Sequence, residues 1–377
     1  MSKYEFIDVD LKHWDQRQLV SSDPGIWYYL PDLKFFRSKW LAIAHVFSLG
    51  MYRGEIESKL RVCYDQNLAF SNYDWTVEPE GDWETMCVEK LKEYRDTHDF
   101  MTLMFSGGQD SNFLLHLCLE NKIKLDEILI YRSNLPGFDN SYVNIEVNTI
   151  ALPHTKNIDL NLVGNPKITV YQINDWKLVE KLLDYDYSFS TWSNLLQKTP
   201  MNMTQKLIQP RSNNSVILRG STEPHIYYDV KIDKYYLQLW DTDNFIDGHC
   251  TNTLTPFFTN PKYPELHAKQ CHLMLNYLRQ NRLKMDSESH LTEYKDIMTI
   301  ITRGGMHIRL NTDAPFFNKK SGNKIFTEKK SMHFVKELKK LHPKLFEMYM
   351  FAANSTIGGS PLIHFGTGTT MGKFYLE

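Results

Sequence analysis

Residues 106–111 read Ser-Gly-Gly-Gln-Asp-Ser, and they hold the residue types in this chain that are best suited to chemistry on a phosphate. Adjacent glycines let the backbone approach a ligand closely, and serine hydroxyls donate hydrogen bonds to phosphate oxygens. The carboxylate of Asp110 is the kind of ligand that Mg²⁺ prefers. This combination predicts an anion site, and we expect the anion to be a nucleotide phosphate.

The neighbouring segments predict how this loop is positioned. Residues 101–105 are an apolar run that is typical of a buried strand, and residues 112–121 have a helical pattern of apolar side chains. The loop would therefore lie between the end of a strand and the start of a helix. The first turn of a helix presents unpaired N–H groups and the positive end of the helix dipole, which together bind anions.

Two other phosphate-binding loops are excluded by spacing. A Walker A loop requires G-x-x-x-x-G-K-[ST], in which the lysine contacts the phosphates, and residues 106–111 contain no lysine. Near the C-terminal end, five residues separate Gly366 from Gly372, one more than this pattern allows. Lys373 is then followed by Phe374 instead of a hydroxyl residue. The Rossmann pattern G-x-G-x-x-G is absent from the first turn as well.

Alternating strand and helix patterns begin near residue 96. The predicted strands are short apolar runs separated by helical segments, which is typical of a parallel sheet with helices on both faces. We therefore expect an α/β fold with a doubly wound parallel sheet, in which ligands bind beyond the carboxyl ends of the strands. The predicted strands are residues 101–105, 127–131, 167–173 and 215–219, the predicted helices are residues 112–121, 142–151, 175–183 and 264–282, and a hairpin is predicted from residues 226–230 and 235–240.

Three segments are expected along the chain. A loop at residues 78–82, followed by a helical pattern at residues 84–95, marks the end of an N-terminal accessory region, residues 1–95. Residues 96–250 form the predicted nucleotide domain. Residues 251–377 form a mostly helical C-terminal part that would bind or cover the substrate.

With its strand and helix, the loop at residues 106–111 resembles the Ser-Gly-Gly-x-Asp-Ser loop of the PP-loop ATP pyrophosphatases, the adenine nucleotide alpha-hydrolase superfamily. In that family the loop holds the β- and γ-phosphates of ATP, and the products are AMP and pyrophosphate. The resemblance covers residues 96–250 and implies a fold of the HUP/PP-loop type, ATP and Mg²⁺ as cofactors, and Asp110 as a metal ligand. The cofactor-binding residues that it implies in the loop are Ser106, Gly107, Gly108, Gln109, Asp110 and Ser111.

Two further segments resemble parts of the same family. Residues 218–223 follow the fourth predicted strand, where family members carry a glycine-led loop with an acidic residue. The resemblance implies that Gly220 contacts the cofactor and that Glu223 is the second metal carboxylate. The spacing of this pair differs by one residue from the asparagine synthetase pattern and is closer to that of NAD and GMP synthetases. After the second predicted strand, the resemblance implies that Tyr131 and Ser133 frame the adenine.

The second half of the chain resembles the synthetase domain of asparagine synthetase. Residues 255–258, Thr-Pro-Phe-Phe, are similar to the Pro-Phe-Leu-Asp segment of those enzymes, with Thr259 in place of the aspartate. Those enzymes also use a late lysine to stabilise the transition state of adenylation. We expect Lys373 to be this lysine, and to form the catalytic set with Asp110 and Glu223. The alternatives are Lys319, Lys320 and Lys324.

No glutaminase domain is expected. Glutamine-dependent asparagine synthetases expose a cysteine nucleophile once Met1 is removed, whereas the second residue here is Ser2. Nitrogen would therefore come from ammonia, from an amine-bearing substrate or from a separate partner.

The charge and cysteine content of the chain argue against some classes of function. The chain has 43 Lys and Arg against 45 Asp and Glu, so bulk electrostatic binding to nucleic acid is not favoured. Residues 319–344 hold nine lysines and two glutamates, which leaves a local nucleic-acid contact open. The five cysteines are dispersed without a Cys-x-x-Cys pair, which argues against a zinc ribbon and suits the reducing cytoplasm. The charged N-terminal segment is unlike a secretory signal, and the apolar runs are too short to span a membrane.

Together these inferences predict an ATP-dependent, AMP-forming ligase. It would adenylate a small carboxylate, carbonyl or amide substrate, release pyrophosphate and transfer the acyl group to a nitrogen nucleophile. Two alternatives stay open. One is a PP-loop enzyme that modifies a nucleobase or transfers sulfur on tRNA or DNA, and the other is a nucleotide-binding protein without turnover.

Overall fold

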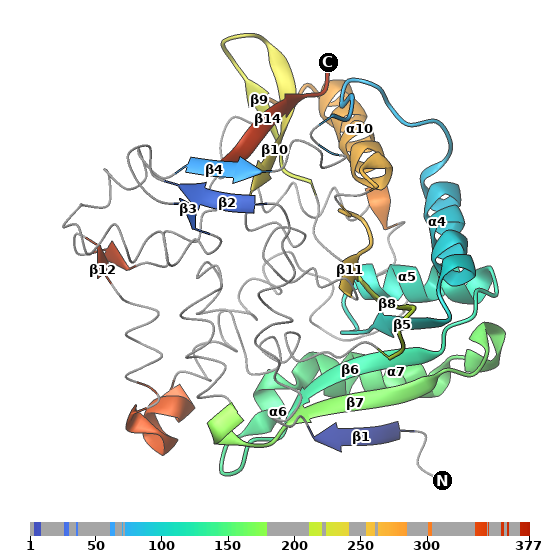
Figure 1. Ribbon diagram of the computed structural model, residues 1–377, viewed down its shortest axis with the longest axis vertical. Coiled ribbons are helices and arrows are strands. Elements are labelled where there is room, and N and C mark those ends of the chain that lie inside the picture. The colour runs from blue at the N-terminus through green and yellow to red at the C-terminus, as the bar shows by residue number, and fades with distance from the viewer. Residues whose placement is uncertain are drawn as a thin grey trace.

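In the computed structural model, a six-stranded parallel sheet organises the part of the chain that carries the predicted loop (Figure 1). The strand order is β1-β7-β6-β5-β8-β11, and every neighbouring pair is parallel. These strands are β1 (Tyr4–Asp8), β5 (Phe100–Met104), β6 (Glu127–Ser133), β7 (Lys167–Ile173), β8 (Ser215–Arg219) and β11 (Leu254–Pro256).

The structure describes the following part of the chain: residues 4–8, 26–29, 35–36, 61–64, 70, 72–178, 211–220, 224–240, 254–260, 263–284, 301–303, 336–344, 346, 356–357, 360–361 and 370–377.

The four strands predicted from apolar runs are confirmed. Strands β7 and β8 match the predicted bounds, β5 begins one residue earlier than expected, and β6 runs two residues further, to Ser133. The N–H of Phe105 donates to the carbonyl of Leu129 at 2.8 Å, which continues the pairing of β5 with β6 beyond Met104. Continuous apolar runs form strands here because both faces of a parallel sheet are buried.

The strand order places the predicted loop at the reversal point of the sheet. From β5 the chain moves to one side through β6 and β7, and then to the other side through β8 and β11, while β1 is added at the edge beside β7. The order therefore reverses between β5 and β8. In open α/β sheets, ligands bind beyond the carboxyl ends of the strands at such a point.

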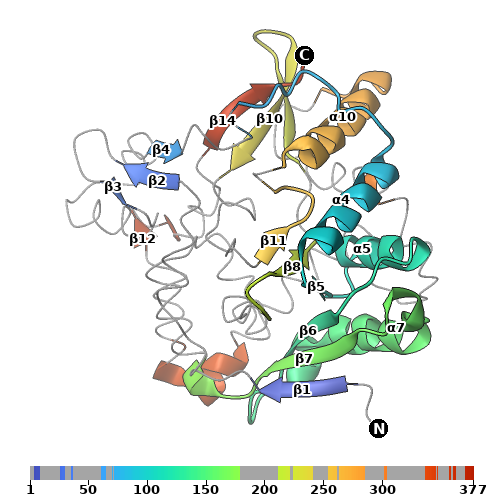
Figure 2. The ribbon, with the colours of Figure 1, turned by 45° about the vertical axis from the view of Figure 1, so that its right-hand side comes forward.

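Helices α4, α5 and α7 lie on the same side of the six-stranded sheet (Figure 2). The predicted helices at residues 84–95, 112–121 and 264–282 are confirmed as α4, α5 and α10, with ends that differ by one to three residues. The helical elements are α4 (Trp83–Thr97), α5 (Gln109–Glu120), α6 (Asn140–Val143), a π-helical turn (Val147–Ala151), α7 (Leu152–Asn157), a 3-10 turn (Leu160–Val163) and α10 (Glu265–Gln280).

The single helix predicted at residues 142–151 is wrong in its continuity. Helix α6 ends at Val143, a π-helical turn covers Val147–Ala151, and α7 begins at Leu152. Pro153 lies in the first turn of α7 and has no N–H to donate to the carbonyl four residues earlier, which favours a change of helical geometry at this point.

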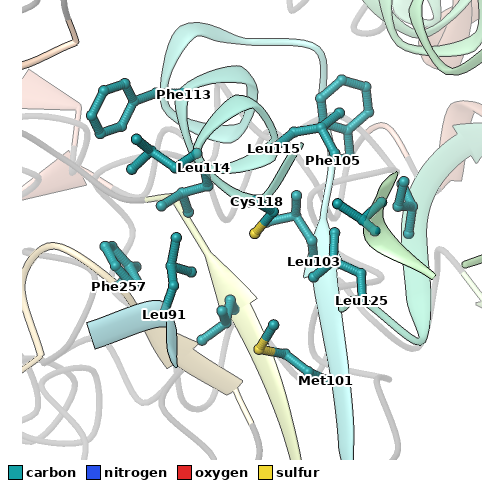
Figure 3. Close-up of a cluster of buried hydrophobic side chains, with 14 of the residues drawn as sticks. Leu91, Met101, Leu103, Phe105, Phe113, Leu114, Leu115, Cys118, Leu125 and Phe257 are labelled. Atoms are coloured by element: carbon teal, nitrogen blue, oxygen red, sulfur yellow. The ribbon is translucent and has the colours of Figure 1, made fainter. Parts of the chain in front are cut away.

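The main hydrophobic core lies between the sheet and helices α4 and α5 (Figure 3). Leu103 of β5 packs there with Leu91 of α4 and Phe113 of α5. The next residue, Met104, belongs to a smaller cluster on the opposite face, with Leu129. Consecutive side chains of a strand point to opposite faces, so β5 contributes to both clusters. This double burial holds the end of β5, and therefore the start of the loop, in a fixed place.

Antiparallel strands form smaller sheets elsewhere in the described part of the chain. The predicted hairpin is confirmed as β9 paired with β10, and β14 pairs with the other edge of β10. The bounds are β9 (Ile226–Asp229), β10 (Lys234–Trp240), β14 (Thr370–Tyr375), β2 (Ile26–Tyr29), β3 (Phe35–Phe36), β4 (Arg61–Tyr64), β12 (Thr356–Ile357) and β13 (Ser360–Pro361).

The six-stranded sheet takes strands from all three segments predicted along the chain. Strand β1 comes from residues 1–95, β5 to β8 from residues 96–250, and β11 from residues 251–377. The three-part division itself stays a prediction. Within the described ranges, no helix has both the length and the apolar character that crossing a membrane requires.

Candidate phosphate-binding site

The loop between β5 and α5 depends on a glycine in the left-handed region. Gly107 has a φ of +82°, which side chains other than hydrogen rarely permit. A Cβ at this position would lie 3.0 Å from the backbone nitrogen of Ala151 and 3.1 Å from Cγ2 of Ile150. Both neighbours belong to the π-helical turn before α7. The turn packs closely against the loop, so any residue other than glycine would be strained here.

Two serine hydroxyls shape the same loop. The N–H of Gly108 donates to Oγ of Ser106 at 3.1 Å, and the hydroxyl of Ser111 donates to the carbonyl of Gly108 at 3.0 Å. The two hydroxyl oxygens are 3.4 Å apart. Ser106 is exposed and Ser111 is buried, so the pair extends from the surface of the loop into the first turn of α5.

Asn112 is a site residue that the sequence argument did not single out. Its side-chain amide donates to the carbonyl of Gly107 at 2.6 Å, and the residue is fully buried. This bond holds the loop onto the first turn of α5. An amide at the start of an otherwise apolar helical segment was the signal in the sequence, since most buried polar groups have a hydrogen-bond partner.

Helix α5 starts without a side-chain cap. Its N-cap residue is Gly108, which has no side-chain acceptor for the first N–H groups of the helix. Gln109, partly exposed, is the first helical residue, and Asp110 lies in the same turn. Uncapped N–H groups and the helix dipole together favour a bound anion at this end.

Gly220 lies against this first turn. It directly follows β8, the neighbour of β5 in the sheet. A Cβ on Gly220 would lie 2.6 Å from Cβ of Asp110 and 3.1 Å from the backbone nitrogen of Ser111. The structure therefore brings together the two segments that the sequence predicted at the site, the loop at residues 106–111 and the glycine after the fourth predicted strand.

Gly220→Ala is expected to displace the first turn of α5 and to weaken phosphate binding. The new Cβ would meet Cβ and the backbone of Asp110, which cannot rotate away. A misplacement of about 1 Å can slow a catalysed reaction roughly 100-fold. We expect the affinity for inorganic pyrophosphate, measured by calorimetry, to fall about 10- to 100-fold. The control is Gly81→Ala, which introduces strain at a φ of +96° before α4 and should lower stability while pyrophosphate affinity changes less than about twofold. Wild-type affinity in the Gly220 variant would contradict the assignment.

The carboxylate of Asp110 is held by an arginine from far along the chain. Nε of Arg303 donates to Oδ1 of Asp110 at 2.7 Å. The arginine side chain is 1 % exposed and the aspartate side chain 31 % exposed, so this ion pair reaches from the interior to the loop. Sequence reasoning missed Arg303, because nothing in residues 301–303 distinguishes it from an ordinary surface arginine.

Aromatic rings surround the buried guanidinium. Its central carbon lies 3.7 Å from the ring centroid of Phe258 and 5.8 Å from those of Trp83 and Phe113. Nη1 donates to Oε1 of Gln270 at 3.2 Å. Nη2 is buried without a hydrogen-bond partner among the described residues, a situation that costs about 1–3 kcal/mol.

The segment that resembles Pro-Phe-Leu-Asp supplies one of these rings. Phe257 and Phe258 follow β11 and are fully buried, and Thr259, in place of the aspartate, is buried too. This segment therefore lies behind the loop, where it packs against Arg303.

Tyr131 and Ser133 have structural contacts that the sequence did not indicate. Ser133 is tied to the following segment, since its hydroxyl donates to Oδ1 of Asn140 at 2.7 Å and its N–H donates to Oδ1 of Asn144 at 2.8 Å. Tyr131 stacks on Tyr171 over the sheet face opposite to α5. Its buried hydroxyl has no hydrogen-bond partner in the described ranges, and burial raises its pKa well above the usual value. Their role at the adenine stays a prediction.

A neutral histidine flanks the end of β5. The ring of His154, in α7, stacks on Phe105 with 6.0 Å between the centroids. Burial, and then the neighbouring His116, lower the pKa of His154 to about 4. His154 is therefore uncharged near neutral pH and contributes packing to the loop rather than a positive charge.

Lys373 is placed in the second sheet, on β14. Its Nζ lies 3.2 Å from Oδ2 of Asp229 and 4.3 Å from the ring centroid of Tyr236. Desolvation lowers the pKa of Lys373, but the hydrogen bonds and charges of Asp229 and Tyr236 together outweigh it, and the pKa is raised. In Figures 1 and 2, β14 lies at the end of the molecule opposite to β1 and β7, and the role of Lys373 at the loop stays a prediction.

The remaining predicted residues lie outside the described part of the chain: Glu223, Lys319, Lys320 and Lys324.

The donors that are described fit a phosphate with its metal. The loop offers hydroxyls, uncapped N–H groups and one carboxylate, and Mg²⁺ on a nucleotide is often held by only one or two protein carboxylates together with the phosphates. Among the described residues, no three His, Cys, Asp or Glu side chains come together as a metal cluster.

Comparisons with known proteins do not assign the chain to a family. No protein-family model matches the chain, and no curated protein matches it.

Proposed function

We propose that this chain is an ATP pyrophosphatase of the PP-loop type that forms AMP and pyrophosphate. One observation carries the proposal. A Ser-Gly-Gly-x-Asp-Ser loop with an uncapped helix lies at the reversal point of a parallel sheet, where Gly220, directly after the neighbouring strand, packs onto the first turn of that helix. The strand order is compatible with a doubly wound sheet of the HUP type, which we propose as the finer fold class.

In this proposal the loop holds the leaving group. The Ser106 and Ser111 hydroxyls and the first N–H groups of α5 would bind the β- and γ-phosphates, and Asp110 with Glu223 would hold Mg²⁺. When bound, Mg²⁺ would neutralise charge on the phosphates. Charge-assisted hydrogen bonds contribute roughly 1.5–3 kcal/mol each, so losing one loop donor should slow the reaction about 10- to 100-fold.

The proposed chemistry is a two-step acyl transfer. A carboxylate oxygen of the substrate attacks the α-phosphorus, the bond to the α–β bridging oxygen breaks, and pyrophosphate leaves with the electron pair. A nitrogen nucleophile then attacks the acyl carbon, AMP leaves, and the nitrogen loses a proton. The protein mainly positions the reactants and neutralises charge. We propose ammonia or an amine as the nucleophile and Lys373, or one of Lys319, Lys320 and Lys324, as the lysine that stabilises the adenylation step.

The thiols are compatible with a cytoplasmic setting, which we propose for the enzyme. Cys87, Cys118 and Cys271 are free and buried. Burial raises the pKa of the Cys118 thiol to about 12, so this group stays protonated and unreactive near neutral pH.

The test is the identity of the nucleotide product. The protein is incubated with ATP, Mg²⁺, ammonium and pooled carboxylate metabolites, and AMP, ADP, phosphate and pyrophosphate are quantified by chromatography. We expect AMP and pyrophosphate in equal amounts. ADP with phosphate would contradict the proposal, as would a chain that binds neither ATP nor pyrophosphate.

A further inference from the structure

Arg303 is held rigidly before any ligand arrives. Its guanidinium lies over the ring of Phe258, and Nη1 donates to Oε1 of Gln270. Gln270 is fully buried, and its own amide nitrogen donates to the carbonyl of Phe258 at 3.2 Å. Ring and amide therefore belong to one packed unit behind the loop, which leaves the guanidinium little freedom to rotate.

This rigidity is passed on to the aspartate of the loop. Arginine has a planar set of donors, so a guanidinium fixed on one side presents Nε in a defined direction on the other. Nε donates to Oδ1 of Asp110 at 2.7 Å. The orientation of this partly exposed carboxylate is thus set by a side chain that solvent does not reach.

The contact has features of a supported site rather than of ordinary core packing. A buried guanidinium is costly to desolvate, and the buried Nη2 has no hydrogen-bond partner in the described part of the chain. Residues that bind a metal are commonly oriented by such a second residue, whose loss weakens metal binding about 10- to 100-fold.

We propose that Arg303 is a positioning residue, which orients the Asp110 carboxylate toward the Mg²⁺ that accompanies the nucleotide phosphates. Phe258 and Gln270 hold Arg303 in place for this role. The inference rests on the proposed function, because it assumes that Asp110 contacts the metal.

The test measures how much Mg²⁺ strengthens the binding of inorganic pyrophosphate. Calorimetry on the full chain measures the pyrophosphate affinity with Mg²⁺ and again with chelator. In the ratio of these two affinities, general effects on folding or on phosphate binding cancel. Arg303→Lys keeps the positive charge but cannot keep the planar contact to both Asp110 and Gln270. We expect this ratio to fall at least fivefold in Arg303→Lys, and by a similar factor in Asp110→Asn.

A double variant shows whether Arg303 acts through Asp110. In the Asp110→Asn background, Arg303→Lys should change the ratio less than about twofold, since effects that pass through one contact are not additive. Phe258→Leu removes the ring but leaves Asp110 and Gln270, the two hydrogen-bonding partners of Arg303, and it should lower the ratio about two- to threefold. This variant replaces the arginine variants in the test if they do not fold. The matched control is Arg211→Lys, a partly buried arginine whose partner Glu127 lies at the start of β6, away from the loop.

The possible outcomes distinguish the positioning role of Arg303 from the phosphate site itself. A wild-type ratio in Arg303→Lys, or additive losses in the double variant, would overturn the positioning role while the phosphate site stands. A protein that binds pyrophosphate without any strengthening by Mg²⁺ would overturn it as well. A protein that does not bind pyrophosphate under either condition would overturn the proposed function itself.

Discussion

Asp110→Asn is expected to lower ATP-dependent AMP formation by about two to three orders of magnitude, which is the usual effect of removing one charge-stabilising group from a transition state. The amide keeps the shape of the side chain but loses the charge that would bind Mg²⁺. Release of pyrophosphate, followed with a coupled assay, is the measurement. Near-normal release would sink the assignment of the loop.

The Arg303 contact adds a second expectation for the same variant. Asparagine retains an oxygen that can accept the hydrogen bond from Nε, so the protein should fold. The buried guanidinium nevertheless loses its counter-charge, and the free energy of unfolding should fall by about 1–3 kcal/mol. The matched control is Asp159→Asn, an exposed residue that accepts the N–H of Asn161 at 3.1 Å, at the start of the 3-10 turn that precedes β7. That variant should keep both activity and stability.

Glu127→Gln is expected to destabilise the protein by about 3 kcal/mol, the loss typical of a buried ion pair from which one partner is removed. Glu127 is 3 % exposed and accepts from Nε of Arg211 at 2.7 Å and from Nη2 at 3.2 Å. The hydroxyl of Thr102 donates to the same carboxylate at 3.0 Å. The glutamine leaves the charge of the partly buried arginine uncompensated. Denaturant unfolding followed by circular dichroism measures the loss.

A double replacement separates the charge from the packing. In Glu127→Leu with Arg211→Met, both charges are removed and apolar volume is kept, so we expect at least half of the lost stability to return. A single variant that loses less than about 1 kcal/mol would show that this pair is screened by water and contributes little.

The loop was predictable because its interactions are local. The contacts that shape it join Ser106, Gly107, Gly108, Ser111 and Asn112, all within seven residues of one another. A strand pattern before it and a helical pattern after it were sufficient to place the loop at a helix N-terminus. The bounds of β7 and β8 followed from apolar runs in the same way, since a strand that is buried on both faces has few polar positions.

Other features required the fold. Arg303 lies 193 positions after Asp110, and no periodicity relates them. The need for glycine at position 220 comes from the approach of β8 to α5, which a list of strands without their spatial order does not contain. The end of α6 at Val143 and the π-helical turn at Val147–Ala151 also escaped the apolar pattern, because helical geometry here depends on what the turn packs against, including Gly107.

The sequence by itself determined that this chain carries a polar glycine loop between a strand and a helix, in a run of alternating strands and helices. Apolar periodicity and turn chemistry act over a few residues, so they can be read along the chain. Only the tertiary structure decided that the loop lies at the reversal point of the sheet, that Gly220 closes against it, and that Arg303 holds its aspartate. Those contacts join residues more than 100 positions apart, and packing of the whole sheet with its helices sets them.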